Sequence, residues 1–428
     1  MTQLTTVNRR DFLRRGASFV ALGATVPSFL AHTVYAAGRR GRRLRGTQRI
    51  LVVVQLAGGN DGLSTIIPVT NDDYYRLRPK LAVAPKGTLT INDDLAFPGS
   101  ATGLKKLYDG GLVSIIQNVG YPNPNRSHFH SMDIWHTASP DGKQRDGWLG
   151  RYFDNQCRGE DSCDPQRGIA VMPETPLAMR GRKFMPLAFS DPTDLSWQAA
   201  VPRRTAAQTV EAMNQPQPGD PQQPVTELQY LRRVALKARI SSEQIYRATA
   251  GRTHNPPTPR ARRPRRRGGA LAASLDTVAN LIGAGIQAGV YYVSHGGYDT
   301  HANQSNTHAR LMGELGEALS GFMQRLKSQG DLDRVLVMTF SEFGRRVAEN
   351  ASGGTDHGTA APMMLIGPRV KPGVVGPNPQ LTNLDAGDLR YALDFRDVYA
   401  TVLQDWLDAS PQIILNRPAG AIDCIRRG

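Results

Sequence analysis

The sequence predicts an α/β fold, in which helices cover both faces of a doubly wound, mostly parallel sheet. Short runs rich in Val and Ile recur along the 428-residue chain without polar alternation, which is typical of strands buried on both faces of a parallel sheet. Segments with apolar residues at helical spacing lie between these runs. Strands that alternate with helices in this way indicate parallel strands joined by helical crossovers.

The predicted elements follow one another in a regular order. Strands are expected at residues 50–57, 112–120, 289–294, 334–340 and 362–367, and helices at 102–111, 131–138, 226–250, 272–289 and 308–330. The region from about 156 to 270 fits the alternation poorly and is expected to form an elaboration. Ligands of a doubly wound sheet bind outside the carboxyl ends of its strands, so that edge is where a site is expected.

An export signal is predicted at residues 1–37. Paired arginines at positions 9 and 10 precede a weakly apolar stretch that ends in small residues near Ala36, which is typical of a twin-arginine signal. A transmembrane helix is the alternative, but Pro27 and the modest hydrophobicity of the stretch argue against it. We therefore expect the twin-arginine translocation machinery as a partner, a periplasmic or extracytoplasmic location, and no integral membrane segment after cleavage.

The net charge of +15 does not by itself indicate a nucleic-acid surface. The excess of arginine lies in the signal, in a basic linker at residues 38–48 and in an Arg/Pro-rich loop at about 252–269. The linker and the loop are rich in Pro, Gly and Arg and lack aromatic residues, which favours disorder over a folded face that reads a nucleic acid. Contact with a polyanion or a membrane surface is the alternative. Residues 49–410 are predicted to form a single domain, followed by a C-terminal tail at 411–428.

The three cysteines add one expectation. Cys157 and Cys163 flank a short polar loop that a disulfide could close in an oxidising compartment, and Cys424 is left over. The sequence has no CxxC pair and no Cys/His cluster, so a zinc site built from thiolates is not expected.

Polar residues follow the predicted strands at the point where each strand ends. Because the carboxyl ends of parallel strands meet at one edge of a sheet, we expect these residues to cluster there. Carboxylate and imidazole together suit Zn²⁺ or Mn²⁺, whereas purely oxygen ligation suits Ca²⁺ or Mg²⁺. The residues are Asp61 after 50–57, Ser127 after 112–120, Asp299 and His301 after 289–294, Glu342 and Arg345 after 334–340, and His357 before 362–367.

Each of these residues also has a purely structural interpretation. The "GGNDG" stretch around Asp61 is a strong turn sequence, and Ser127 is a natural helix N-cap. Glu342 could pair with a following arginine, and "GGYDTH" around Asp299 could be only a polar turn. No ligand spacing distinguishes the other histidines, which include His128, His130, His136, His295 and His308.

Long stretches of the chain resemble the bacterial domain-of-unknown-function 1501 family. The likeness rests on the export signal and on motifs in order between residues 48 and 408, and it is weak across about 156 to 270. The family supplies no established substrate. The motifs are "LVVVQLAGGNDGLSTIIPVTNDDYYRLRPKLA", "SHFHSMDIWHTASPDG", "GWLGRYFD", "GGYDTHANQ", "RVLVMTFSEFGRRVAENASGGTDHGTAAPM" and "LDFRDVYATVLQDWL".

In outline the chain is also similar to the alkaline phosphatase and sulfatase superfamily. That resemblance implies a divalent metal centre of two ions (Zn, Mn or Ca), the first held by Asp61, Ser127 and Glu342 and the second by Asp299, His301 and His357. Asp356 with His357 is an alternative register for the late ligand pair. "RSHFH" around Ser127 is not a standard nucleophile motif of the superfamily, and Glu342 stands where Asp is common.

The resemblance implies a hydrolase of small anionic phosphate or sulfate esters. In that reading Ser127 or an activated water is the nucleophile, and Arg345 or Arg346 holds the tetrahedral oxyanion. The alternative is a non-catalytic surface or assembly protein that retains the fold and a structural metal. An open coordination position beside Ser127 would favour the enzyme, because structural sites are closed.

Overall fold

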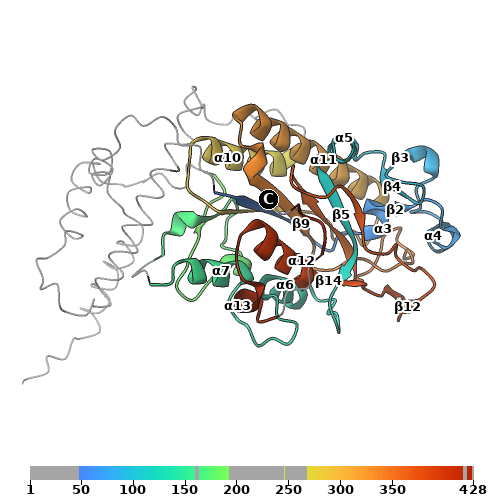
Figure 1. The fold of residues 1–428 in the computed structure, drawn as a ribbon. Helices are drawn as coiled ribbons and strands as arrows, with labels where there is room; N and C mark the ends of the chain where they lie inside the picture. Colours follow the sequence, from blue (N-terminus) through green and yellow to red (C-terminus); the bar gives the residue numbers. More distant parts are fainter. Residues whose placement is uncertain (1–47, 160–162, 192–244, 246–267, 418–421, 427–428) are drawn as a thin grey trace, which may run out of the picture.

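The computed structural model describes residues 48–159, 163–191, 245, 268–417 and 422–426. A nine-stranded sheet runs through the middle of this part of the chain, with helices above and below it (Figure 1). The α/β class and the mostly parallel, doubly wound sheet are thereby confirmed. No helix in the described part of the chain is both long and apolar enough to cross a membrane.

The central sheet has the order β11-β5-β10-β9-β1-β8-β6-β7, and β14 also pairs with β5. Its strands are β1 (Ile50–Ala57), β5 (Val113–Gly120), β6 (Gly168–Ala170), β7 (Leu187–Ala188), β8 (Val290–Gly296), β9 (Val335–Phe340), β10 (Ala361–Ile366), β11 (Gly373–Val375) and β14 (Leu393–Asp394). The five predicted strands all occur within a residue or two of their expected bounds. Strand β10 runs antiparallel to its neighbours β9 and β5, while the other pairings are parallel.

The helices are α3 (Gly62–Thr65), α4 (Asp72–Leu77), α5 (Thr102–Asp109), α6 (His128–Thr137), α7 (Trp148–Gln156), α10 (Gly269–Gly283), α11 (Gln304–Gln329), α12 (Phe395–Thr401) and α13 (Pro411–Leu415). A π-helical turn at Val402–Trp406 continues α12, and short 3₁₀ turns lie at Pro85–Gly87, Pro165–Arg167, Leu177–Met179 and Leu332–Arg334. Two small sheets complete the fold, β2 (Ile67–Pro68) with β4 (Leu95–Pro98) and β3 (Thr88–Thr90), and β12 (Leu384–Asp385) with β13 (Asp388–Leu389). The helix expected at 226–250 and the loop at 252–269 lie almost entirely outside the described residues.

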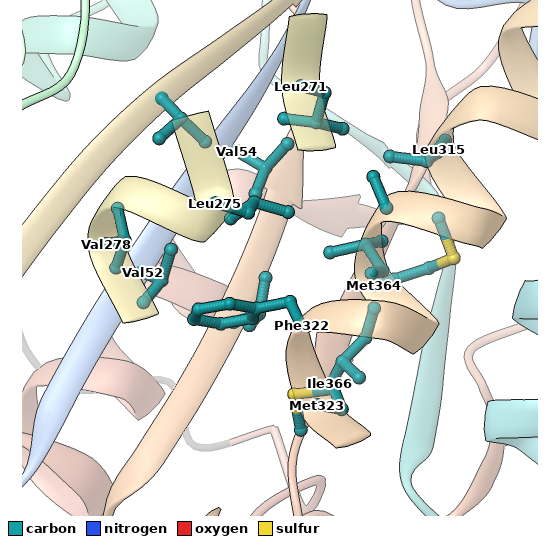
Figure 2. Packing of buried hydrophobic residues seen from close by; sticks show 14 of the residues in the cluster. Val52, Val54, Leu271, Leu275, Val278, Leu315, Phe322, Met323, Met364 and Ile366 are labelled. Carbon is teal, nitrogen blue, oxygen red and sulfur yellow. The ribbon is translucent and has the colours of Figure 1, made fainter. Parts of the chain in front are cut away.

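Two apolar layers hold the helices against the sheet. Side chains alternate along β1, so Val52 and Val54 enter one layer while Leu51 and Val53 enter the other. The first layer is closed by α5, α10 and α11, and Figure 2 shows leucines of α10 and Phe322 of α11 packed over β1 and β10. The second is closed by α6, α7, α12 and α13. Burial on both faces explains why these strands are continuously apolar.

The domain continues beyond residue 410, which corrects the predicted C-terminal tail. Ile414 and Leu415 of α13 are buried in the second layer, and so are Cys424 and Ile425. Ile425 also forms an isolated bridge with Val370. Apolar side chains at these positions remove more surface from water when packed than as a solvated tail, so the segment belongs to the core.

Two further features bear on the organisation of the chain. Cys157 and Cys163, for which the sequence left a disulfide open, form one. Strand β1 lies between β8 and β9, so the chain passes to opposite sides of β1 at this point of the sheet. A crevice opens at the carboxyl ends of strands where the order reverses in this way, which makes the loops after β1, β8 and β9 the place to look for a site.

Candidate metal centre

Three side chains from distant parts of the sequence meet at this edge of the sheet. His128, Asp299 and His357 each offer one ligand atom, and these atoms all lie within 4.8 Å of one another. Within the ranges that the structure describes, this is the one group of His, Cys, Asp and Glu residues with such a spacing. Two imidazoles and a carboxylate form a donor set that suits Zn²⁺ or Mn²⁺.

The fold brings each member to the edge by a different element. His128 is the first residue of α6, which follows β5 after a short loop. Asp299 lies in the loop after β8, and His357 lies in the loop before β10. Because β10 is antiparallel, its first residue lies at the edge where the parallel strands end, and this is why His357 reaches the same place.

Glycines allow these loops to approach closely. Gly58 has a φ of +120°, and a Cβ there would lie 2.4 Å from the backbone nitrogen of Asp299. A Cβ at Gly59 would lie 2.3 Å from the ring of Phe343. That ring lies under the two histidines, with centroid distances of 4.9 Å to His128 and 4.6 Å to His357. The "GG" pair is therefore needed for close packing at the site as well as for a turn.

His357 is held so that one ring nitrogen faces the carboxylate. Its Nδ1 lies 2.8 Å from the carbonyl oxygen of Arg126, and a carbonyl can only accept, so Nδ1 carries the proton. In the neutral ring the lone pair of Nε2 then points toward Asp299 Oδ1 at 3.2 Å. Burial lowers the pKa of His357, which favours this neutral form.

His128 has the same arrangement. Its Nδ1 lies 2.9 Å from Glu342 Oε1, and its Nε2 lies 3.6 Å from Asp299 Oδ2. Glu342 is itself fixed, because Oε1 accepts a hydrogen bond from the Gly58 N–H at 2.8 Å and Oε2 accepts one from the Ser341 hydroxyl. A carboxylate that orients a histidine from behind is the usual support of a metal ligand. Glu342, predicted as a ligand, therefore lies behind a candidate ligand.

Asp299 provides the negative charge at the centre. Burial opposes its ionisation, but the hydrogen bond and the charge of Arg345 outweigh this effect and lower the pKa of Asp299 to about 2. Arg345 Nη2 lies 2.6 Å from Asp299 Oδ1, and His301 Nδ1 lies 2.8 Å from the same oxygen. An imidazole lone pair that faces a carboxylate is repelled by it, and a cation among the three side chains removes that repulsion. The donor set thus fits a divalent ion.

Asp61 has a different environment from the predicted one. Its side chain is 1% exposed and forms an ion pair with the buried Arg78, whose Nη1 lies 2.6 Å from Oδ2 and Nη2 3.0 Å from Oδ1. Asp61 also accepts hydrogen bonds from the Leu63 N–H and from Ser64 Oγ, so it caps α3. We correct the assignment of Asp61 on this basis, because both of its oxygens bind neighbouring donors.

Arg345 is also corrected. Its guanidinium is fully buried and donates to the carbonyl oxygens of Gly58, Gly59, Tyr298 and Thr355 as well as to Asp299. Each of its three nitrogens donates to at least one of these acceptors and the side chain is 0% exposed, so it is not placed to bind an oxyanion from solvent. Through these hydrogen bonds Arg345 instead joins the loops after β1, β8 and β9 and holds Asp299 in place.

The remaining predicted residues lie around the group. Ser127 is exposed at the N-cap of α6, and its hydroxyl makes no capping hydrogen bond. The side chain of His301 is 45% exposed, and its ring centroid lies 4.7 Å from that of His357, although it is not a member of the group. Asp356 of the alternative register is exposed and accepts a hydrogen bond from Asn350 instead. His128 was not predicted as a ligand, because the sequence alone does not distinguish it from the nearby histidines at positions 130 and 136.

Replacing Glu342 with glutamine is expected to weaken metal binding about tenfold to a hundredfold, because the variant keeps the shape behind His128 but loses the charge that makes the ring more basic. Titration of purified protein with Zn²⁺ against a competing chelator measures the effect. The unchanged melting temperature of the metal-free variant would show that the fold is intact. An affinity equal to that of the wild type would show that Glu342 does not support a ligand.

Comparisons with known proteins identify the family of this chain. The family described as "Protein of unknown function (DUF1501)" matches residues 114–408, which is more than half of the chain. No curated protein matches the sequence.

Three solved structures illustrate the likeness of fold. A protein in the alkaline phosphatase superfamily from Vibrio parahaemolyticus has 10% identity and a TM-score of 0.38, covering 88% of this chain and 71% of that one. The PsFucS1 sulfatase from Pseudoalteromonas sp. has 11% identity and a TM-score of 0.36, covering 89% and 69%. The C-terminal periplasmic domain of EcEptC from Escherichia coli, in complex with Zn, has 10% identity and a TM-score of 0.36, covering 76% and 75%. Identities and scores this low leave the chemistry of the site to be deduced from its own residues.

Proposed function

This chain belongs to the DUF1501 family, and from the side chains at its sheet edge we propose that it is a metal-dependent hydrolase of phosphate or sulfate esters. The observation that supports this most strongly is the convergence of His128, Asp299 and His357, whose ligand atoms lie within 4.8 Å of one another. Each histidine is held from behind by a hydrogen bond, to Glu342 or to the Arg126 carbonyl. Such preorganisation is typical of a functional metal site rather than of scattered surface residues.

The proposed ligands are the two Nε2 atoms of His128 and His357 and the carboxylate of Asp299. We propose one ion, Zn²⁺ or Mn²⁺, and leave out the second ion, because Asp61 and Glu342 have other partners. When bound, the ion would supply positive charge that stabilises the ester oxygens as negative charge develops on them. The side chain of Asp299 is 49% exposed, so the group opens toward solvent, as a catalytic site requires.

The chain's own residues would carry out the bond changes. Ser127 is the proposed nucleophile, because its hydroxyl is exposed next to His128 and is not used as a helix cap. Its oxygen would bond to phosphorus or sulfur while the bond to the ester oxygen breaks. His301, whose Nδ1 is turned to Asp299, would accept the serine proton at Nε2 and pass it to the leaving alcohol. Water would then cleave the seryl ester and restore the serine.

A second candidate is a non-catalytic protein with a structural ion. It is favoured by Arg345, which joins Asp299 to three loops of the scaffold. The two functions differ in one respect, because only the enzyme requires Ser127. An extracytoplasmic location is also part of the proposal, because it depends on the predicted export signal at residues 1–37. Those residues lie outside the described part of the chain.

The test is an ester screen on protein loaded with Zn²⁺ or Mn²⁺, using 4-nitrophenyl phosphate, bis(4-nitrophenyl) phosphate and 4-nitrophenyl sulfate. Wild type is expected to hydrolyse at least one of them, and His128→Ala is expected to lose both the bound metal and the activity. His130→Ala is the matched control, because His130 is exposed on the same helix and outside the group. If the wild type binds metal but hydrolyses none of the esters, and Ser127→Ala leaves metal binding unchanged, the structural ion is favoured.

A further inference from the structure

A buried carboxylate lies between two arginines beside the candidate metal centre. Asp388 of β13 is fully buried, while the side chains of Arg126 and Arg346 are 41% and 37% exposed. Arg126 Nη2 donates to Asp388 Oδ2, and Arg346 Nε lies 3.7 Å from Oδ1. Oδ1 accepts no hydrogen bond from the described part of the chain. Burying a carboxylate is costly unless cations accompany it, so Asp388 fixes both guanidinium groups at this place.

Both arginines are joined to the metal-binding loops through their backbones. The carbonyl oxygen of Arg126 accepts the hydrogen bond from His357 Nδ1, and Arg126 precedes Ser127 and His128 in sequence. The backbone N–H of Arg346 donates to the Asp356 carbonyl, next to His357 in the chain. The backbones of both arginines therefore lie beside His357, and their guanidinium groups extend from there to Asp388 at what we call the rim of the site.

Donors remain available at this rim. Nε and Nη1 of Arg126 have no protein acceptor among the described residues, because its side-chain hydrogen bond to Asp388 uses Nη2. The first turn of the ten-residue helix α6 is close by, and the side chain of Ser127 does not cap it. Free N–H groups at a helix start and an oriented guanidinium both favour an anion. Arg345 cannot serve in this way, since its donors are engaged.

We propose that Arg126, oriented by Asp388 and assisted by Arg346, binds the anionic group of the substrate and selects a dianion over a monoanion. This inference rests on the proposed function and names its substrate class: phosphate monoesters are preferred over sulfate esters and phosphodiesters. Asp388 is a positioning residue, because it acts through the arginines and not on the ester.

The charges around the site support the preference. The three arginines at positions 126, 345 and 346 and a divalent ion bring five positive charges against three negative charges on Asp299, Glu342 and Asp388. The surplus of two matches a doubly charged phosphate monoester better than a singly charged sulfate ester. Asp356 and Asp385 carry further negative charge nearby, but both are exposed and screened by water, so they change this balance less than the buried groups do.

The test compares two anions of nearly the same shape that contain no cleavable ester. Phenylphosphonate, at a pH where it is doubly ionised, and benzenesulfonate are titrated into the wild-type protein by calorimetry, with Zn²⁺ loaded and without metal. Phenylphosphonate is expected to bind at least tenfold more tightly to the loaded protein. Arg126→Met is expected to weaken that binding about tenfold or more and to narrow the preference. Arg76→Met is the control, because Arg76 is an exposed arginine whose guanidinium pairs with Asp73 and not with Asp388.

Asp388→Asn separates positioning from simple electrostatics. Removing a negative charge would strengthen anion binding if only net charge counted, whereas loss of orientation is expected to weaken it severalfold. Equal affinities for the two anions, an Arg126→Met variant that binds like Arg76→Met, or tighter binding by Asp388→Asn would each overturn the inference. If Arg126→Met also weakens phenylphosphonate binding in the metal-free protein, the inference about Arg126 is supported even if the Zn²⁺-loaded protein hydrolyses no ester. The inference and the proposed function can therefore fail independently of each other.

Discussion

Arg78→Met is expected to lower the free energy of unfolding by about 3 to 5 kcal/mol, the usual cost of removing one partner of a buried ion pair. The side chains of Arg78 and Asp61 are 0% and 1% exposed, so the variant would leave Asp61 charged inside the protein with no cation against it. Arg78 also donates to the carbonyl oxygens of Arg346 and Val347, which would lose their partner as well. Stability and not chemistry should therefore depend most on this pair.

Urea denaturation of the metal-free protein measures this effect. Arg76→Met, two residues away and exposed, should change stability by less than about 0.5 kcal/mol. The double variant Asp61→Asn with Arg78→Met should recover part of the loss, because it leaves no buried charge unpaired. A loss below about 1 kcal/mol in Arg78→Met would mean that Asp61 finds another partner, and would reopen its assignment as a ligand.

The ion pair between Arg78 and Asp61 also makes the free energy of unfolding depend on pH. Burial opposes ionisation of Asp61, but the charge and hydrogen bonds of Arg78 prevail and lower its pKa from 3.8 to about 2. A lowered pKa stabilises the folded state above pH 3.8, and this contribution fades as the pH falls from 3.8 toward 2. In Arg78→Met the carboxyl group loses that partner, so the deficit relative to wild type should shrink as the pH falls through this window.

Asp299→Asn is expected to weaken metal binding a hundredfold or more. The substitution keeps the shape of the side chain but removes the one negative charge among the three proposed ligands, and loss of a direct ligand should exceed the tenfold to hundredfold effect of a supporting residue. Competition with a chelator gives the affinity, and the melting temperature with and without chelator gives a second reading.

Asp356→Asn is the matched control for that experiment. Asp356 is an exposed aspartate one residue before His357, and it is not a member of the group. It should bind metal like the wild type. Equal affinities in Asp299→Asn and wild type would return "GGYDTH" to a polar turn, whereas equal losses in both aspartate variants would point to a general effect of surface charge.

The sheet could be predicted from sequence because its cause is local. Five continuous apolar runs gave the five long strands, since burial on both faces imposes that composition on each strand separately. The antiparallel direction of β10 could not be predicted in this way, because it depends on the path of the chain between β9 and β10. The short strands β6, β7, β11 and β14 carry too few residues to show a pattern.

The sequence predicts that polar groups gather at one edge of the sheet, but not which partner each of them takes. Residues at strand ends must gather at one edge, and Asp299 and His357 do so. Which partner each polar group takes is decided in three dimensions. Arg78 reaches Asp61 across an intervening helix, and Glu342 meets His128 from 214 positions away. No spacing in the sequence separates His128 from His130 two residues on, although one lies in the group and the other is exposed.

Anomalous diffraction from crystals grown with Zn²⁺, recorded on both sides of the zinc absorption edge, tests the central claim most directly. We expect one strong peak bounded by Nε2 of His128, Nε2 of His357 and the carboxylate of Asp299, at distances of about 2.0 to 2.2 Å from these atoms. The same crystals of Asp299→Asn should show that peak weakened or gone. A wild-type crystal without a peak at this place, or with its zinc held by Asp61 and Glu342 instead, would contradict the assignment of the metal centre.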